Sequence, residues 1–281
     1  MHPVDFGYSA PTTVAQACTE LSGGSRCTRL LAGGMSIMPL IVRRLARPER
    51  LVDITRIAAL QQLTSTGEGL RVGAAVVQRR LEVSAELAGY DLLRQALPRI
   101  GSVSTRNRGT VVGSLAHADP GAQLGVCLVA LGGELTAVST AGARRIPVTD
   151  FFRGPYTTAL RADELLTDVT FARPPLHTIG YFESVSLRGR GDTPLISVAL
   201  LGRRRVDAVP RLVVGGAGRI PSPIPASILD DLSDRSIDSA SHTLREVLRF
   251  DDDLRASANH RARLTVRVLA RLLRRYREEN R

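Results

Sequence analysis

The stretch RNRGTVVGSLAHADP, at residues 106–120, carries most weight in interpreting the fold. Within it, two valines lead into Gly113 and then Ser114. A second stretch, LLAGGMSIMP at residues 30–39, has the same order of apolar residues, glycine and a small hydroxyl residue. Glycine lacks Cβ, so its backbone can approach a bulky anion and adopt positive φ, which lets successive N–H groups converge on phosphate oxygens. The two stretches therefore predict loops that bracket a pyrophosphate.

Neither stretch matches the common nucleotide-binding patterns. GxGxxG after a strand would indicate a Rossmann fold, and GxxxxGK[ST] would indicate a nucleotide triphosphatase. Both patterns are missing from residues 30–39 and 106–120. Taken alone, these residues indicate an α/β protein with a candidate phosphate-binding site.

The first 55 residues predict a small α/β unit. Thr13 and Gln16 have the spacing of a capping box, and apolar residues then recur at helical spacing until Gly23. Short apolar runs at 30–32 and 51–54 indicate strands on either side of the first glycine stretch. A helix and two strands within 55 residues favour a compact α/β arrangement.

Residues 56–172 predict a larger α+β unit whose strands are antiparallel. Strands are expected at 70–74, 134–139 and 165–171, and helices at 79–87, 92–100 and 122–131. The polar residues 102–109 are expected to form a loop, followed by a short apolar step at Val111-Val112.

Arg173-Pro174-Pro175 marks the expected start of a C-terminal domain, residues 173–281. Three strands of one sheet are predicted there, at 181–187, 195–201 and 211–214. The remainder is expected to be helical, ending in an amphipathic, arginine-rich helix at about residues 255–279 that packs against the core.

The charge is strongly basic, yet it does not indicate nucleic-acid binding. The net charge is +11, all 38 basic residues are arginine, and they are scattered along the chain. Aromatic residues make up 4% and tryptophan is absent, which disfavours a stacking surface for single strands. A basic surface that meets an acidic protein partner is a secondary hypothesis, because arginine suits protein interfaces.

Cysteine usage and the N-terminus predict a cytoplasmic protein without a metal site. Cys18, Cys27 and Cys127 are far apart and form no CxxC pattern, so buried free thiols are expected. No charged segment followed by an apolar one begins the chain, and no apolar run is long enough for a membrane span.

The two glycine stretches together resemble a known family. AGGMSIMP at residues 32–39 is similar to the AGGxSLxP signature, and residues 106–120 to the RNRGTIGGNLAHADP signature, of the FAD-binding medium subunits of carbon monoxide dehydrogenase, xanthine dehydrogenase and other molybdenum hydroxylases. Further matches lie at 45–54, 150–158 and 163–166, and the terminal helix is similar to that family's C-terminal domain.

The resemblance implies a PCMH-type FAD-binding domain at residues 1–172, made of subdomains at about 1–55 and 56–172, and a C-terminal domain. It implies a flavin subunit that takes electrons from the [2Fe–2S] clusters of an iron–sulfur small subunit. Those clusters accept electrons from a molybdopterin large subunit, and the flavin passes the electrons to a terminal acceptor. No catalytic residue is assigned to the protein itself.

The resemblance also implies which residues contact FAD. They are the first stretch, the second stretch and two separate positions: Leu31, Ala32, Gly33, Gly34, Met35, Ser36 and Ile37; Thr110, Val111, Val112, Gly113 and Ser114; Gln123 and Leu166.

Three positions depart from the family pattern. Val112 replaces the first of two glycines, and a β-branched side chain there disfavours positive φ and would crowd the cofactor. Gln123 stands where relatives have Asp, and it keeps hydrogen-bonding capacity. A lysine that relatives carry near the flavin is missing, and Arg188 is the nearest replacement. Val112→Gly is accordingly expected to preserve or strengthen FAD binding.

Other functions remain open at this level. The altered positions leave room for a stand-alone flavoenzyme acting on a small molecule, or for a non-redox homologue that has lost or repurposed the flavin. His117 and Asp119 are expected to order their loop rather than to catalyse, since no nucleophile stands beside them.

Overall fold

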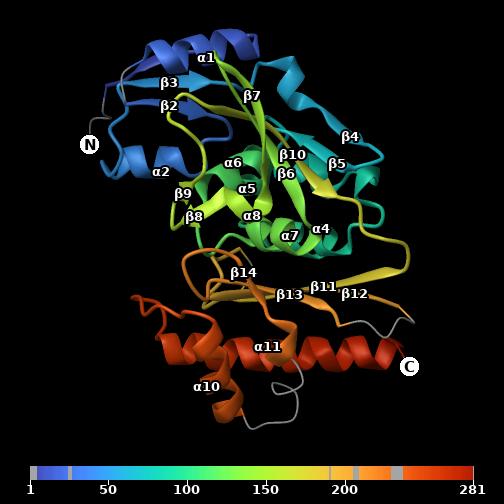
Figure 1. Cartoon of the computed structure of the whole chain (residues 1–281). Coiled ribbons are helices and arrows are strands. Elements are labelled where there is room, and N and C mark those ends of the chain that lie inside the picture. The colour runs from blue at the N-terminus through green and yellow to red at the C-terminus, as the bar shows by residue number, and fades with distance from the viewer. Residues whose placement is uncertain (1–4, 25–26, 190, 205–208, 229–236, 281) are drawn as a thin grey trace.

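The computed structural model describes residues 5–24, 27–189, 191–204, 209–228 and 237–280. Figure 1 shows three layers: a small sheet with its helices, a larger mixed unit in the middle, and a sheet covered by long helices at the C-terminal side. This mixed architecture confirms the predicted fold class. The division into domains at residue 173 stays a prediction.

The N-terminal layer is a parallel sheet in the order β1-β3-β2. Its strands are β1 (Gly7–Ser9), β2 (Thr28–Leu31) and β3 (Arg50–Asp53), with helices α1 (Val14–Gly23) and α2 (Ile37–Val42) beside them. The predicted capping box is confirmed: Thr13 Oγ1 accepts the Gln16 N–H at 3.2 Å, and the Gln16 side chain accepts the Thr13 N–H.

The middle layer is an antiparallel sheet in the order β4-β5-β10-β6-β7. Its strands are β4 (Leu63–Ser65), β5 (Gly69–Gly73), β6 (Gly133–Ser139), β7 (Gly142–Pro147) and β10 (Leu165–Ala172). Its helices are α3 (Gln78–Glu82), α4 (Asp91–Ala96), α5 (Val103–Arg108), α6 (Val111–His117), α7 (Gln123–Leu131) and α8 (Val148–Phe151), and a ribbon of β8 (Phe152–Gly154) and β9 (Thr157–Thr158) follows. Short 3-10 turns lie at Ala58–Gln61, Ala85–Leu87 and Leu97–Arg99.

The C-terminal sheet has four strands where three were predicted. It comprises β11 (Thr178–Val185), β12 (Ile196–Arg203), β13 (Arg211–Gly215) and β14 (Ser222–Ile224), all antiparallel, followed by a 3-10 turn at Ala226–Ile228, α10 (Ile237–Val247) and α11 (Ala258–Asn280). The additional strand β14 contains a proline and is only three residues long, so it carries no alternating pattern by which a strand is recognised.

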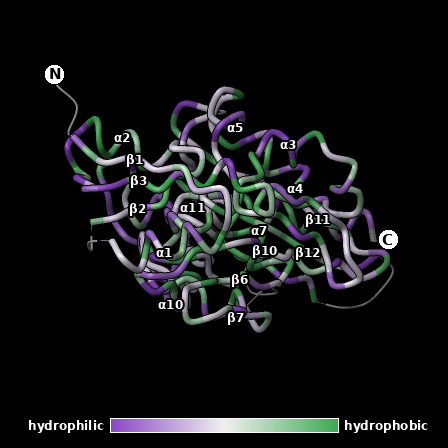
Figure 2. The backbone as a smooth tube through the Cα atoms, turned by 90° about the horizontal axis from the view of Figure 1, so that it is seen from above, coloured by the Kyte–Doolittle hydropathy of each residue, from purple (hydrophilic) through white to green (hydrophobic). Residues whose placement is uncertain are grey.

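The C-terminal sheet lies between two layers of helices. Phe182, Ala199 and Val213 belong to the core shared with α7, whereas their strand neighbours, such as Tyr181 and Val198, pack with α11. This alternation is the two-residue period of strands buried on both faces. Seen from above, apolar residues gather along α7 and the inner strands (Figure 2).

Two other sequence expectations need correction. Residues 102–109 are not a loop: the Ser102 side chain accepts the Thr105 N–H at 3.1 Å and caps helix α5. Cys18 and Cys127 are buried as expected, but Cys27 is exposed. All three cysteines are described, and they form no disulfide.

Candidate functional site

A cavity of about 550 Å³ opens where the small N-terminal sheet meets the middle layer. Its walls come from the end of β2, the start of α2, the residues before and within α6, and the start of β10. Its lining is largely apolar with a few polar groups, and its volume lies within the range of about 300–1,000 Å³ typical of small-molecule sites.

The first glycine stretch forms an open turn against the second. Gly34 has φ of 73°, in the left-handed region that glycine favours. A Cβ added to Gly33 would lie 2.0 Å from the carbonyl oxygen of Arg108 and 2.8 Å from the Cα of Gly109. Gly33 therefore lets the two stretches touch backbone to backbone.

The second glycine stretch is the start of a helix, and the expected loop is wrong here. Thr110 is the N-cap of α6, and its Oγ1 accepts the Gly113 N–H at 3.0 Å. Val112 lies in the first helical turn, is buried, and is not among the residues with positive φ. The expected conflict between a β-branched residue and positive φ does not arise.

The residues before α6 are tied to the start of α3. The Gln78 N–H donates to the Gly109 carbonyl at 2.8 Å, and the Val111 N–H donates to the Val76 carbonyl at 3.1 Å. The Gln78 side chain lines the cavity, and its Nε2 donates to the Thr110 carbonyl at 3.4 Å. These bonds hold the start of α6 against the start of α3.

The facing wall is held by an ion pair between the buried Glu164 and the partly exposed Arg144. The Arg144 guanidinium donates to both carboxylate oxygens of Glu164, at 2.6 and 2.7 Å, and this pairing holds the pKa of Glu164 below its usual range. Glu164 also accepts the Arg161 N–H at 2.7 Å. Leu165 and Leu166 follow at once and line the cavity, so the ion pair positions the apolar start of β10.

The cavity gathers most of the residues expected from the sequence. Those that line it are Ala32, Gly33, Gly34, Met35, Ser36, Ile37, Thr110, Val112, Gly113, Ser114 and Leu166. Leu31, Val111 and Gln123 are not part of the lining. Val111 is fully buried in the core, and Gln123 is buried at the start of α7, where its Nε2 donates to the Arg99 carbonyl at 3.2 Å.

Several cavity residues were not assigned to the FAD site from the sequence. Arg29 supplies a cation to the lining, and His117 packs against Tyr156 with ring centroids 5.1 Å apart. Burial lowers the pKa of His117, which keeps its imidazole neutral at pH 7. Tyr156 and Glu164 lie in the stretches 150–158 and 163–166, which resemble the family. That resemblance could have assigned both residues to the site.

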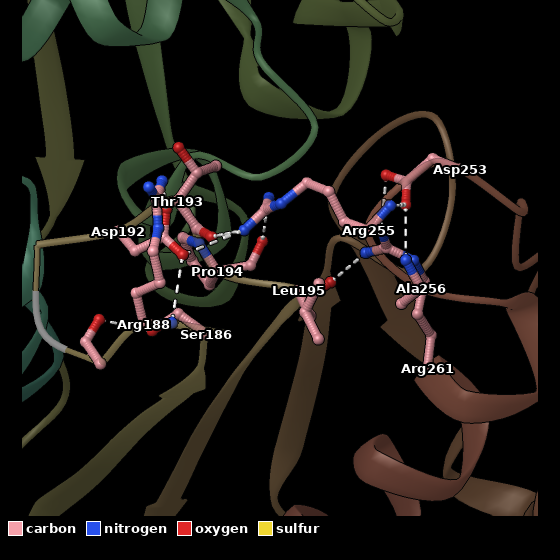
Figure 3. A network of polar contacts seen from close by, with 11 residues as sticks. Ser186, Arg188, Asp192, Thr193, Pro194, Leu195, Asp253, Arg255, Ala256 and Arg261 are labelled. Atoms are coloured by element: carbon pink, nitrogen blue, oxygen red, sulfur yellow. Dashed lines mark hydrogen bonds and ion pairs between the residues drawn. The ribbon is translucent and has the colours of Figure 1, made fainter.

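A second cavity, of about 470 Å³, adjoins the first at Tyr156. Figure 3 shows its polar network, in which Asp192 pairs with Arg188 at 3.1 Å and with Arg255 at 3.5 Å. Arg261 pairs with Asp253 at 2.6 Å and also donates to the Leu195 carbonyl, which joins the start of α11 to the residue before β12. Arg188 lines this second cavity and not the first, so its side chain does not stand in the wall built by the glycine stretches.

Two negative findings apply to the described parts of the chain. None of their helices combines the length and apolar character needed to cross a membrane. They also contain no group of three or more His, Cys, Asp or Glu side chains placed to hold a metal ion.

Comparisons with known proteins agree with this geometry. Residues 4–174 match the family described as FAD binding domain in molybdopterin dehydrogenase. The nicotine 6-hydroxylase medium subunit of Paenarthrobacter nicotinovorans is 32% identical over 274 residues, covering 95% of each chain.

Solved structures match over nearly the whole length. Reconstituted CO dehydrogenase from Oligotropha carboxidovorans superposes with a TM-score of 0.89 at 26% identity, over 99% of this chain and 100% of that one. Quinoline 2-oxidoreductase from Pseudomonas putida 86 gives a TM-score of 0.86 at 28% identity, over 98% of both chains.

Proposed function

Because the chain belongs to the family of FAD-binding domains of molybdopterin dehydrogenases, we propose that it is the flavin subunit of a molybdenum hydroxylase complex. Its cofactor is FAD. In the proposed complex the chain receives electrons from the [2Fe–2S] clusters of a small subunit, which drain a molybdopterin large subunit. The observation that carries the proposal is the cavity walled by both glycine stretches.

The residues present fit FAD. Gly33, Gly34 and Gly113 all line the cavity, and the missing Cβ of Gly33 lets the two stretches meet backbone to backbone, so that both can present backbone N–H groups to a pyrophosphate. The apolar lining, including Leu165 and Leu166, suits a flat ring system excluded from water. Bound FAD supplies the redox chemistry of its isoalloxazine ring, and the protein supplies binding and orientation.

Individual side chains have distinct tasks in this proposal. Ser36 and Ser114 line the cavity with hydroxyl groups that can donate to phosphate oxygens or accept from ribityl hydroxyls. Neutral His117 adds a hydrogen-bonding group without adding charge. The Arg144–Glu164 pair keeps the apolar wall in place from behind.

The proposal of a complex is supported by the relatives, which are subunits of multi-subunit enzymes. The matched nicotine 6-hydroxylase protein is a medium subunit, and this chain covers 95% of it. A relative from Hydrogenophaga pseudoflava, 26% identical over 97% of both chains, is a carbon monoxide dehydrogenase medium chain. A stand-alone flavoenzyme and a non-redox homologue are therefore not favoured. We place the complex in the cytoplasm, where reduced cysteines are expected.

The test is purification of the tagged chain from its source organism. The expected result is one FAD per chain, together with iron, acid-labile sulfide and molybdenum in the same gel-filtration peak. A colourless chain that also rejects added FAD would overturn flavin binding. An FAD-loaded chain that carries no iron and oxidises an organic substrate by itself would instead make it a stand-alone enzyme.

A further inference from the structure

The imidazole of His117 lies in the wall of the first cavity. It belongs to the last residue of helix α6 and is partly buried. Its ring packs against that of Tyr156, with ring centroids 5.1 Å apart and the planes tilted by 53°. Neither ring nitrogen has a hydrogen-bond partner among the residues that the structure describes. Both nitrogens are therefore available to groups that the protein does not itself supply.

Helix α6 runs from the second glycine stretch toward the apolar wall of the cavity. Gly113 and His117 are four residues apart and both line the cavity, so they share one face of the helix. With a rise of about 1.5 Å per residue, His117 lies about 6 Å further along the axis than Gly113. Helix α6 also packs against β10, whose residues Leu165 and Leu166 line the cavity. With a pyrophosphate at the glycine stretches, His117 is on the side that the proposed function gives to the flavin ring.

His117 is the group in this cavity wall that suits proton exchange near neutral pH. The titratable side chains in the described part of the wall are Arg29, His117, Tyr156 and Glu164. Arginine keeps its proton, pairing with Arg144 lowers the pKa of Glu164, and burial raises the pKa of Tyr156. Burial lowers the pKa of His117, although the nearby Asp119 opposes this shift. A neutral imidazole can accept a proton at one nitrogen while it donates from the other.

Tyr156 connects His117 to the second cavity. It lines both cavities and is 61% exposed. The Tyr156 N–H donates to the Ala118 carbonyl at 2.9 Å, which ties this residue to the end of α6. The wall of the second cavity carries Asp119 and the paired side chains Arg188, Asp192 and Arg255 (Figure 3). So polar a wall suits water, and solvent can therefore reach His117 along Tyr156.

We propose that His117 relays protons between solvent in the second cavity and the flavin ring of bound FAD. This inference rests on the proposed function. Iron–sulfur clusters deliver electrons without protons, whereas each pair of electrons that the ring takes up requires a proton for a new N–H bond. As the clusters are oxidised, one nitrogen of His117 gives its proton to the ring and the other takes a proton from a hydronium ion or buffer acid. The proton returns by the same route when the ring is reoxidised, which restores the first tautomer of His117.

The experiment uses the full-length chain loaded with FAD. Reduced methyl viologen, which supplies electrons but no protons, is mixed rapidly with the chain in ordinary or deuterated water, and the loss of oxidised-flavin absorbance is followed. The test variant is His117→Gln. The control is His242→Gln, which changes an exposed histidine of α10 that lines neither cavity. Reduction is repeated with added imidazole.

Three further measurements need no reduction. FAD per chain and the midpoint of thermal unfolding are compared among wild type and both variants. The histidine ring nitrogens of the wild-type chain are observed by NMR without and with FAD, and the signals missing from His117→Gln identify His117.

The expected result is that His117→Gln keeps its FAD and its unfolding midpoint, but its flavin is reduced about 100-fold more slowly, the size typical of a lost proton-transfer group. Added imidazole should restore much of the rate in this variant and leave the control unchanged. Wild-type reduction should slow in deuterated water. The ring-nitrogen signals of His117 should shift when FAD binds.

Three results would overturn the proposal. His117→Gln could be reduced at the wild-type rate, it could lose a rate that imidazole does not restore, as a merely structural role would predict, or the His117 signals could stay unchanged when FAD binds. A wild-type chain that takes up no FAD would contradict the proposed function, and this inference with it, so the two failures are distinguishable.

Discussion

The two glycine stretches have the same order of residue types and opposite structures. Around Gly33 and Gly34 the chain leaves a strand and turns through positive φ. Around Gly113 it enters a helix, whose first turn is capped by Thr110. Gly33 allows close backbone approach and Gly34 the positive φ, whereas Gly113 lies beneath the capping hydroxyl of Thr110. The same order of apolar residue, glycine and hydroxyl residue thus forms a turn on one side of the cavity and a capped helix start on the other.

The largest effect is expected from Gly33→Ala. The new Cβ would lie 2.0 Å from the Arg108 carbonyl oxygen, so the two stretches must separate, at a cost of about 3 kcal/mol or more. FAD retention should be lost as well. Urea unfolding and FAD content measure both effects, and Gly67→Ala, whose Cβ would meet nothing within 4 Å, is the control. Equal stability of the two variants would refute the contact.

Val112→Gly should destabilise the protein. The sequence alone led us to expect only that this change would preserve or strengthen FAD binding. Val112 is helical and 2% exposed. Removing its side chain and placing glycine in a helix should together cost about 2–4 kcal/mol. The unfolding free energy with and without FAD separates the effect on the fold from any gain in binding. A variant as stable as wild type would show that the second stretch is not helical.

Glu164→Gln tests the cavity wall at the start of β10, which the Arg144–Glu164 ion pair holds and to which neither glycine stretch contributes. Pairing with Arg144 lowers the pKa of Glu164, so the stabilisation is present above its unfolded pKa of about 4.3 and is lost as pH falls through the lower folded value. At pH 7 the variant should be less stable by about 1–2 kcal/mol, because Arg144 is partly exposed. Unfolding curves of both proteins should converge in acid, and a pH-independent difference would exclude the charge as the cause.

The smallest effect is expected from Thr110→Val, which removes the cap of α6. Loss of the bond to the Gly113 N–H should cost about 1 kcal/mol. Thr110→Ser keeps the hydroxyl and should stay close to wild type. Thermal unfolding of the pair measures the cap, and a loss in Thr110→Ser with none in Thr110→Val would mean that the methyl group, not the hydroxyl, stabilises this turn.

Much of the fold follows from periodicity. The capped first helix, strands β5, β6 and β10 of the middle sheet and the buried face of the last helix all show the spacing that predicted them, whereas the outer strands β4 and β7 were not predicted. Helix α5 was missed because its residues are mostly polar and only Arg106 is buried, so no apolar stripe appears. Its ion pair with Glu82, at 2.9 Å, joins residues far apart in sequence and leaves no local signal.

The sequence largely predicted which residues share the cavity but not their contacts, and their role in binding FAD stays a prediction. Eleven of the fourteen expected residues line one cavity, because they belong to two short contiguous stretches and one strand start. The contact of Gly33 with Arg108 joins positions more than seventy residues apart, and burial of Gln123 depends on packing around α7. Such tertiary relations are not encoded in spacing along the chain.

The most direct test is a crystal structure of the chain with FAD bound. The account predicts that FAD occupies the cavity between Gly33-Gly34 and the start of α6, with the apolar residues Leu165 and Leu166 in its wall. FAD found instead in the second cavity beside Arg188 and Asp192, or bound away from both glycine stretches, would contradict it.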